Sequence, residues 1–148
     1  EITIIGRFDA AYASKRYLKR LIERKTKPGK LPTRADKTAI FQAALYAYLH
    51  ELNRISAKDA VLEIFYCSQQ LCPLKLIRNR IIFCVKHCSF SKKFKIPYLK
   101  VRDYMLKKLD RFIGILKGDI KPIPTRYKSV CEMCYYREYC PVYKERKK

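Results

Sequence analysis

The order in which strand-like and helix-like periodicities follow one another restricts the fold of this chain most strongly. Residues 2–8 (ITIIGRF) are rich in β-forming side chains, and residues 17–26 (YLKRLIERKT) alternate so that every second side chain shares a face. We expect a strand over each segment, with residues 10–16 as the hairpin connection. Residues 27–32 (KPGKLP) form a loop, because prolines and glycine do not continue a central strand.

A helix is predicted after that loop. Thr33 and Asp36 have the spacing of a capping box, with Asp in the place usually taken by Glu or Gln. Apolar side chains then recur at helical intervals, at Phe41, Leu45, Tyr48, Leu49 and Leu52. We expect this stripe to face the core.

Three further segments complete the pattern. Residues 60–66 (AVLEIFY) and 80–85 (RIIFCV) have the composition of strands. Residues 98–116 carry a long amphipathic pattern that a glycine ends. The order strand, strand, helix, strand, strand, helix predicts an α/β (α+β) fold with a mixed central sheet flanked by helices. We divide the chain into a core over residues 1–121 and a cysteine-bearing tail over residues 122–148 that packs on it.

The charge of the chain indicates its partner. Lys and Arg number 34 against 13 acidic residues, so the formal net charge is +21. Solubility needs a net charge of only roughly 2–8, and a larger field attracts polyanions, so we expect nucleic acid as the partner. The basic clusters at residues 15–20 and 92–95 are candidates for phosphate contacts. No run reaches the ~18 apolar residues of a membrane span, and residues 1–9 do not resemble a secretory leader. We therefore expect a soluble, cytoplasmic protein that does not attach to membranes.

Three side chains near the first two expected strands have the chemistry of metal-assisted hydrolysis. If these strands are neighbours, Asp9 comes near Glu23, and two carboxylates can hold a hard divalent cation. Lys25 points the same way as Glu23, because side chains alternate along a strand. Phosphodiester hydrolysis needs such a cation and a positive group for the developing charge. Taken alone, however, the three residues are more typical of an exposed hairpin ion pair.

The residues around this trio resemble the RecB-like branch of the PD-(D/E)XK nucleases. The pattern of that branch is Gly-x-x-Asp, Glu-x-Lys and Gln-x-x-x-Tyr, which the chain carries as Gly6 to Asp9, Glu23 to Lys25, and Gln42 with Tyr46. The resemblance implies a restriction-endonuclease-like core in which Asp9 and Glu23 bind magnesium or manganese and Lys25 assists catalysis. It also implies that Gln42 and Tyr46 lie near the active site and contact DNA. Residues four apart on a helix share a face, which agrees with this role, although an ordinary half-exposed helical pair has the same spacing.

One feature departs from the pattern of that branch. Its members have an upstream helix whose His or Glu completes the metal site, whereas this sequence begins eight residues before Asp9. We therefore expect a reduced or truncated N-terminal part. This departure leaves a second hypothesis open, a non-catalytic nucleic-acid-binding module on a degenerate nuclease fold, and a third, a structural subunit that recruits other proteins.

Cys131, Cys134 and Cys140 form a C-x2-C-x5-C group in an aromatic and basic tail. Thiolates at this spacing bind one metal ion or cluster from a tight turn. The triplet is similar to the C-terminal end of the CRISPR-associated RecB-like exonucleases, which implies a 4Fe-4S iron-sulphur cluster whose fourth cysteine precedes the nuclease motifs. No cysteine precedes Cys67 here, so the fourth ligand is absent or replaced.

The remaining cysteines leave alternatives open. Cys67 and Cys84 lie in strand patterns and are expected to be small core residues. Cys72 and Cys88 are expected to be exposed, and they can pair as a disulfide if the source is a hyperthermophile. A Zn2+ site that uses the triplet plus His87 or Cys88 is the main alternative to the iron-sulphur cluster. His50 is expected to be a helix-surface residue.

These observations combine into one functional prediction. We expect a metal-dependent deoxyribonuclease, an exonuclease on single-stranded DNA ends that is similar to the CRISPR-associated family. That resemblance implies either a role in antiviral defence, in spacer acquisition with the CRISPR integrase complex as a partner, or the processing of virus or repair DNA. The chain has no Gly-rich phosphate loop, so NTP hydrolysis is not expected. The tyrosines of the tail either stack on unpaired bases or pack the tail onto the core; they are Tyr135, Tyr136, Tyr139 and Tyr143.

Overall fold

The computed structural model describes residues 3–68, 91–121, 128–134, 137–139 and 143–144. The chain divides into two compact units, Glu1–Leu109 and Asp110–Lys148, and each is described by itself. The first unit contains the sheet and the candidate site. The expected boundary at residue 121 stays a prediction.

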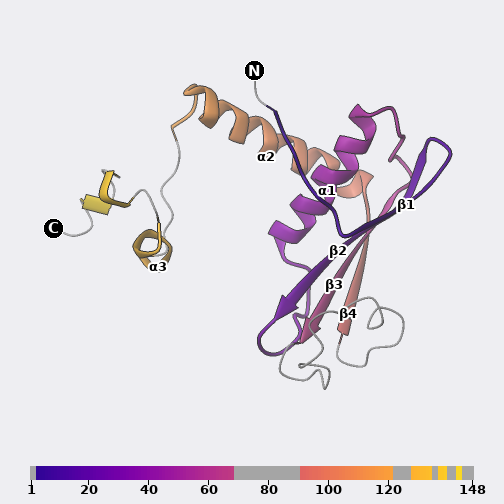
Figure 1. Cartoon of the computed structure of the whole chain (residues 1–148), viewed down its shortest axis with the longest axis horizontal. Coiled ribbons are helices and arrows are strands. Elements are labelled where there is room, and N and C mark those ends of the chain that lie inside the picture. Colours follow the sequence, from indigo (N-terminus) through magenta and orange to yellow (C-terminus); the bar gives the residue numbers. More distant parts are fainter. Residues whose placement is uncertain (1–2, 69–90, 122–127, 135–136, 140–142, 145–148) are drawn as a thin grey trace. The chain divides into compact units, whose positions relative to one another are not determined.

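Four strands form one mixed sheet in the order β1-β2-β3-β4 (Figure 1). β1 is antiparallel to β2, β2 is parallel to β3, and β3 is antiparallel to β4. The helix α1 lies in the sequence between the parallel strands, and α2 follows β4. The fold class predicted from the sequence, a mixed sheet with flanking helices, is therefore confirmed. The bounds are β1 Ala10–Ser14, β2 Tyr17–Lys27, α1 Lys37–Leu52, β3 Val61–Ser68, β4 Ser91–Pro97 and α2 Leu99–Lys117.

The first strand does not lie where the sequence predicted it. Residues 3–8 form no regular structure, and β1 instead occupies most of the segment 10–16 that was expected to be a loop. β1 and β2 are joined by a tight turn in which Lys15 has φ 55°. This segment meets α1 instead of extending the sheet, since Gly6 lies against the ring of Tyr46 and Phe8 lies against Tyr46 and His50.

Helix α1 begins three residues later than the capping-box prediction places it. Asp36 is itself the N-cap, and its Oδ1 accepts a hydrogen bond of 2.8 Å from the backbone N–H of Ala39. Its own N–H donates to the hydroxyl of Tyr66 on β3 at 2.9 Å. The cap therefore fixes both the start of the helix and its position above the sheet.

The helix packs on the sheet through alanines, not through the predicted apolar stripe. The stripe residues are only half-buried, and Leu52 is 61% exposed. Small side chains let the helix backbone lie close to β2 and β3, whose apolar side chains complete the core. The fully buried residues of this layer are Ala39, Ala43, Ala44, Ala47, Leu21, Leu62, Ile64 and Tyr66.

The sequence prediction also missed β4. The phosphate contacts considered for its lysines stay a prediction. In the described sheet, Lys92, Lys93 and Lys95 lie on an edge strand (SKKFKIP), where lysine discourages pairing with other chains. The strand expected at residues 80–85 lies outside the described residues. Helix α2 confirms the amphipathic segment, and Gly118 follows it with φ +85°. Where β4 meets α2, the hydroxyl of buried Tyr98 donates to Glu51 on α1 at 3.0 Å.

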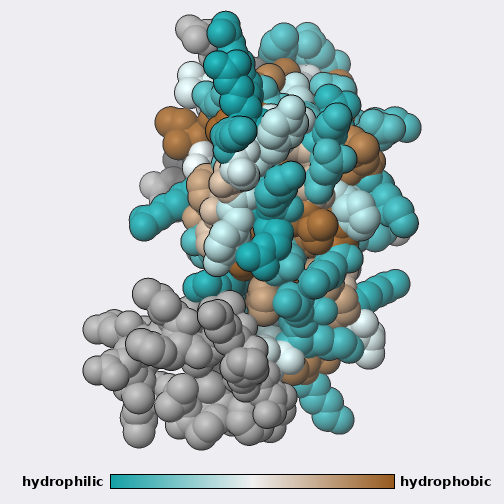
Figure 2. Space-filling view, turned by 90° about the vertical axis from the view of Figure 1, so that its right-hand side faces the viewer, coloured by the Kyte–Doolittle hydropathy of each residue, from teal (hydrophilic) through white to brown (hydrophobic). Residues whose placement is uncertain are grey.

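Two short helices of the second unit are described, α3 at Lys128–Glu132 and a 3-10 turn at Arg137–Tyr139. None of the helices described is long and apolar enough to cross a membrane. On the face drawn in Figure 2, hydrophilic side chains predominate and hydrophobic ones are scattered between them. This surface agrees with the high net charge.

Candidate active site

Strand β2 presents Glu23 and Lys25 towards α1. In the parallel pairing with β3, Glu23 lies beside Ile64 and Lys25 beside Tyr66. Ile64 and Tyr66 pack against Ala39 of α1, and neighbouring residues in register share a face. The two predicted site residues of β2 therefore lie under the helix. Glu23 is only 4% exposed.

The ammonium group of Lys25 is held from two sides. Its Nζ lies 2.7 Å from Oε1 of Glu23 and donates to Oε1 of Gln42 on α1 at 2.7 Å. A lysine ammonium has three N–H donors, and within the part of the chain that the structure describes two of them are engaged, which leaves one for a ligand. The side chain is partly exposed, at 30%, so that donor can reach a bound molecule.

Gln42 and Tyr46 extend this arrangement along the helix. Nε2 of Gln42 donates to the hydroxyl of Tyr46 at 3.0 Å. The predicted pair therefore shares one face, and Tyr46 is buried rather than half-exposed. Hydrogen bonds connect Glu23, Lys25, Gln42 and Tyr46 in one chain across β2 and α1.

Asp9 joins the site through the backbone of β2. Its Oδ2 accepts a hydrogen bond of 2.6 Å from the N–H of Arg24, the residue between Glu23 and Lys25. The pairing of β1 with β2 ends at Ala10 and Ile22. Beyond that pair, the side chain of Asp9 takes the place of a strand backbone as the hydrogen-bond partner of β2. The structure thus brings Asp9, Glu23 and Lys25 to one place, as the sequence pattern predicts.

The electrostatics of Glu23 favour a bound cation. Burial raises the pKa of its carboxyl above the ordinary 4.5, the hydrogen bond and charge of Lys25 lower it, and the charge of Asp9 raises it again. The net shift is upward, so Lys25 alone does not compensate the ionised carboxylate. A divalent cation shared with Asp9 would compensate it.

The donor set matches magnesium or manganese. Among the described residues, no group of three or more His, Cys, Asp or Glu side chains could hold a metal ion, so the site offers the two carboxylates Asp9 and Glu23. Mg2+ keeps several waters and is commonly bound by one or two carboxylates plus substrate phosphates. Two carboxylates beside a free lysine N–H therefore suit a cation that acts together with a phosphate substrate.

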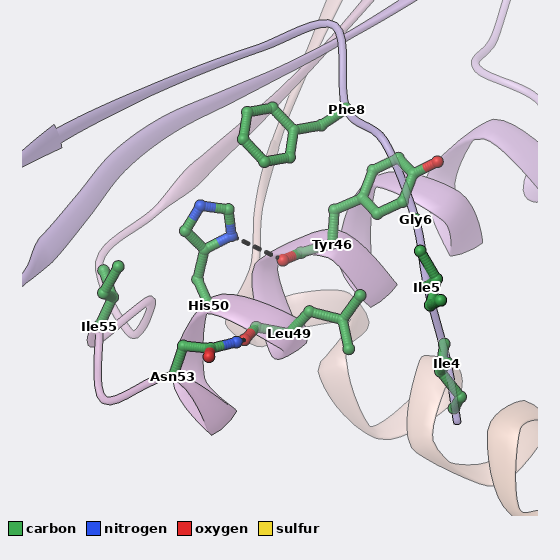
Figure 3. Close-up of a pocket in the computed structure, with 9 residues that line it drawn as sticks. All are labelled: Ile4, Ile5, Gly6, Phe8, Tyr46, Leu49, His50, Asn53 and Ile55. Carbon is green, nitrogen blue, oxygen red and sulfur yellow. Dashed lines mark hydrogen bonds between the residues drawn. The ribbon is translucent and has the colours of Figure 1, made fainter. Parts of the chain in front are cut away.

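Sequence reasoning missed how the N-terminal segment meets α1. A Cβ on Gly6 would overlap the ring of Tyr46, so only glycine fits at this approach. Phe8 lies edge-on to Tyr46 and 5.2 Å from the ring of His50. His50, expected on the helix surface, is half-buried and lines a pocket beside the site (Figure 3). The signal available in the sequence was the glycine of Gly-x-x-Asp.

The cysteine triplet is only partly described. The backbone N–H of Cys134 donates to the carbonyl of Cys131 at 3.2 Å, which closes a tight turn. Cys140 lies outside the described residues, as do Cys72, Cys84, His87 and Cys88. Cys67 is on β3 and half-buried. The metal or cluster site of the tail stays a prediction.

Comparison with known proteins gives one match. The family model described as PD-(D/E)XK nuclease superfamily matches residues 1–141. No curated protein and no solved structure matches the chain. The matched range contains the sheet, α1 and every residue of the candidate site.

Proposed function

Since this chain belongs to the PD-(D/E)XK nuclease superfamily, we propose that it hydrolyses DNA phosphodiester bonds in a reaction that requires Mg2+ or Mn2+. The observation that carries the proposal is the position of Lys25. Its ammonium is bonded to Glu23 and Gln42, while Asp9 is anchored to the backbone between Glu23 and Lys25.

Asp9 and Glu23 are the residues that would hold the cation. When bound, a divalent cation supplies Lewis-acid polarisation of the scissile phosphate and activation of water. Glu23 must be ionised to bind it, and because its pKa is raised, cation binding should be lost at a higher pH than for an ordinary glutamate. The hydrogen bond from Arg24 keeps Asp9 next to this carboxylate.

Lys25 would stabilise the charge that develops on the phosphate oxygens. Two of its donors are engaged by Glu23 and Gln42, which fixes the direction of the third. A donor positioned in advance costs no reorganisation during the reaction. Gln42 is a positioning residue, because it acts through Lys25, and Tyr46 in turn holds Gln42.

The superfamily implies a nucleic-acid substrate, and the net charge of +21 supports one through attraction to phosphates. We propose single-stranded DNA ends as the preferred form. The exonuclease mode and the setting beside the CRISPR integrase rest on the resemblance of the tail alone.

The same resemblance supports a 4Fe-4S cluster on Cys131, Cys134 and Cys140, with Zn2+ as the alternative metal. Protein purified without oxygen distinguishes them. A brown protein with iron-sulphur absorbance and iron in excess of zinc supports the cluster, whereas a colourless protein with stoichiometric zinc refutes it. Substituting Cys131 by Ser should remove the metal in either case.

Cleavage of labelled single-stranded DNA in Mn2+ tests the nuclease function. The informative pair is Lys25→Met and Lys58→Met, because Lys58 is an exposed lysine in the turn before β3 and lies outside the basic clusters. We expect the wild type and Lys58→Met to degrade the DNA, and both a chelator and Lys25→Met to stop it. DNA binding without cleavage by any protein would instead identify a non-catalytic binding module.

A further inference from the structure

The pocket beside the carboxylate site has no part in the chemistry proposed above, and we propose that it binds one unpaired nucleobase of the substrate strand. This inference rests on the proposed nuclease function and adds how the strand is held. The pocket has a volume of about 410 Å³, within the roughly 300–1,000 Å³ of small-molecule sites. It lies between the N-terminal segment and the C-terminal half of α1 (Figure 3).

Aromatic rings form its walls. The Phe8 ring is 5.2 Å from the His50 ring and 6.3 Å from the Tyr46 ring, measured between centroids. Phe8 is 39% exposed, so a ligand at the mouth can reach its face. Unpaired bases stack on such rings whatever their sequence. Aliphatic side chains complete the lining, at Ile4, Ile5, Leu49 and Ile55.

A hydrogen-bonding group stands among these apolar walls. Nδ1 of His50 lies 2.8 Å from the carbonyl oxygen of Tyr46, and a carbonyl only accepts, so Nδ1 carries the proton. In the neutral ring, Nε2 is then an acceptor. Adenine, cytosine and guanine each carry an exocyclic amino group that donates to an acceptor of this kind. Stacking faces with the polar side chains of His50 and Asn53 among them suit a base better than a purely apolar ligand.

The pocket and the carboxylate site share adjoining residues. Phe8 directly precedes Asp9, and Tyr46, whose ring lines the pocket, accepts from Gln42 of the lysine chain. A nucleotide with its phosphate near Asp9 and Lys25 would therefore bring its base to this wall. A base within a duplex is stacked and paired and does not enter such a pocket without being extruded. The pocket thus selects unpaired strands.

Binding of single-stranded DNA that carries 2-aminopurine at its end tests the proposal. The assay runs in a chelating buffer, so no strand is cut, and stacking quenches the fluorescence of the base. Phe8→Leu removes one stacking ring, and Tyr104→Leu is the matched control, an aromatic residue on α2 that is 37% exposed and lies outside the pocket. We expect Tyr104→Leu to quench like the wild type, and Phe8→Leu to lose most of the quenching and to bind about tenfold more weakly. Equal quenching by Phe8→Leu and the wild type overturns the proposal.

An abasic strand provides a second measurement. The wild type should bind a strand without its terminal base about tenfold more weakly than the intact one, and Phe8→Leu should bind both alike. If Phe8→Leu does not fold, His50→Leu takes its place in the assay, because it removes the ring on the other side of the pocket. Equal binding of both strands by the wild type overturns the proposal.

These outcomes are separate from the nuclease test. Base-dependent binding without Mn2+-dependent cleavage would refute the nuclease function but support the base-binding role of the pocket. Cleavage with base-independent binding would refute the pocket alone.

Discussion

Gly6 lies directly against the ring of Tyr46, with no room for a Cβ between them. Gly6 stands three residues before Asp9, and Tyr46 stands four residues after Gln42. The contact therefore joins the first and last parts of the Gly-x-x-Asp, Glu-x-Lys and Gln-x-x-x-Tyr pattern. It explains in steric terms why glycine begins the segment that delivers Asp9 to β2.

Gly6→Ala should reduce cleavage at least tenfold with little loss of stability. The added methyl group would overlap a Tyr46 ring that is buried and held by Gln42, so the exposed N-terminal segment has to move and Asp9 moves with it. Gly29→Ala is the matched control, because nothing lies within 4 Å of a Cβ there. Cleavage rates and melting temperatures of both variants test this expectation. Equal cleavage by the two variants would refute the steric role of Gly6.

Tyr46→Phe should lower kcat about tenfold and leave the melting temperature nearly unchanged. The ring stays against Gly6 and Phe8, but the hydroxyl that accepts from Gln42 is lost, and Lys25 is positioned less well. A tenfold loss of kcat corresponds to about 1.4 kcal/mol of activation free energy. Tyr48→Phe, a half-buried tyrosine on the same helix, should cleave like the wild type. Unchanged kcat for Tyr46→Phe would contradict the positioning role.

Glu23→Gln should stabilise the protein at neutral pH when no divalent cation is present. Because burial raises the pKa of this carboxyl in the folded state, the folded protein binds the proton more tightly than the unfolded chain does. Stability is therefore lost as the pH rises from the unfolded value through the raised one. We expect the melting temperature of Glu23→Gln to exceed that of the wild type by about a few degrees at pH 7.

The difference in melting temperature between Glu23→Gln and the wild type should disappear below pH 4.5, the ordinary pKa of this carboxyl. Below that pH, Glu23 is protonated in both the folded and the unfolded state. Glu132→Gln, on an exposed glutamate, should match the wild type at every pH. A Glu23→Gln protein that melts below the wild type at pH 7 in a chelating buffer would contradict the direction of the shift.

Asp36→Ala should cost about 1 kcal/mol of unfolding free energy, as N-cap removal does. The hydrogen bond from the N–H of Ala39 is the main reason that the pKa of Asp36 lies below 3.8. That contribution is present above the unfolded pKa and is lost as the pH falls through the folded one. Urea unfolding at pH 7 and at pH 3 measures the difference in unfolding free energy between wild type and Asp36→Ala, and this difference should be smaller at the lower pH. Asp59 lies in an exposed loop. If Asp36→Ala loses no more unfolding free energy at pH 7 than Asp59→Ala does, Asp36 does not stabilise the protein as an N-cap.

The sequence predicted the elements whose periodicity is local. β2, β3 and α2 were predicted within a few residues, because alternation and the helical pattern act within each segment. β4 was missed because three lysines within four residues of an edge strand look like a basic cluster. The buried face of α1 was missed because its alanines add little to a hydrophobic pattern, although they decide how closely a helix can pack.

The residues of the candidate site could be predicted from motif spacing, whereas the contacts that hold them in place could not. The partner of Asp9 is a backbone N–H, which carries no signature in the sequence. The partner of Gly6 lies 40 residues further along the chain, and the pocket combines residues 4–8 with residues 46–55. Contacts at such separations depend on how β1 and β2 place the N-terminal segment over α1, and no single segment encodes that placement.

Binding of Mn2+ measured by calorimetry tests the central claim most directly, namely that Asp9 and Glu23 together hold one divalent cation. The variants are Asp9→Asn and Glu23→Gln, with Asp59→Asn as the matched control in an exposed loop. We expect the wild type and Asp59→Asn to bind one ion alike, and each site variant to bind at least tenfold more weakly. Unchanged binding by both site variants would contradict the account.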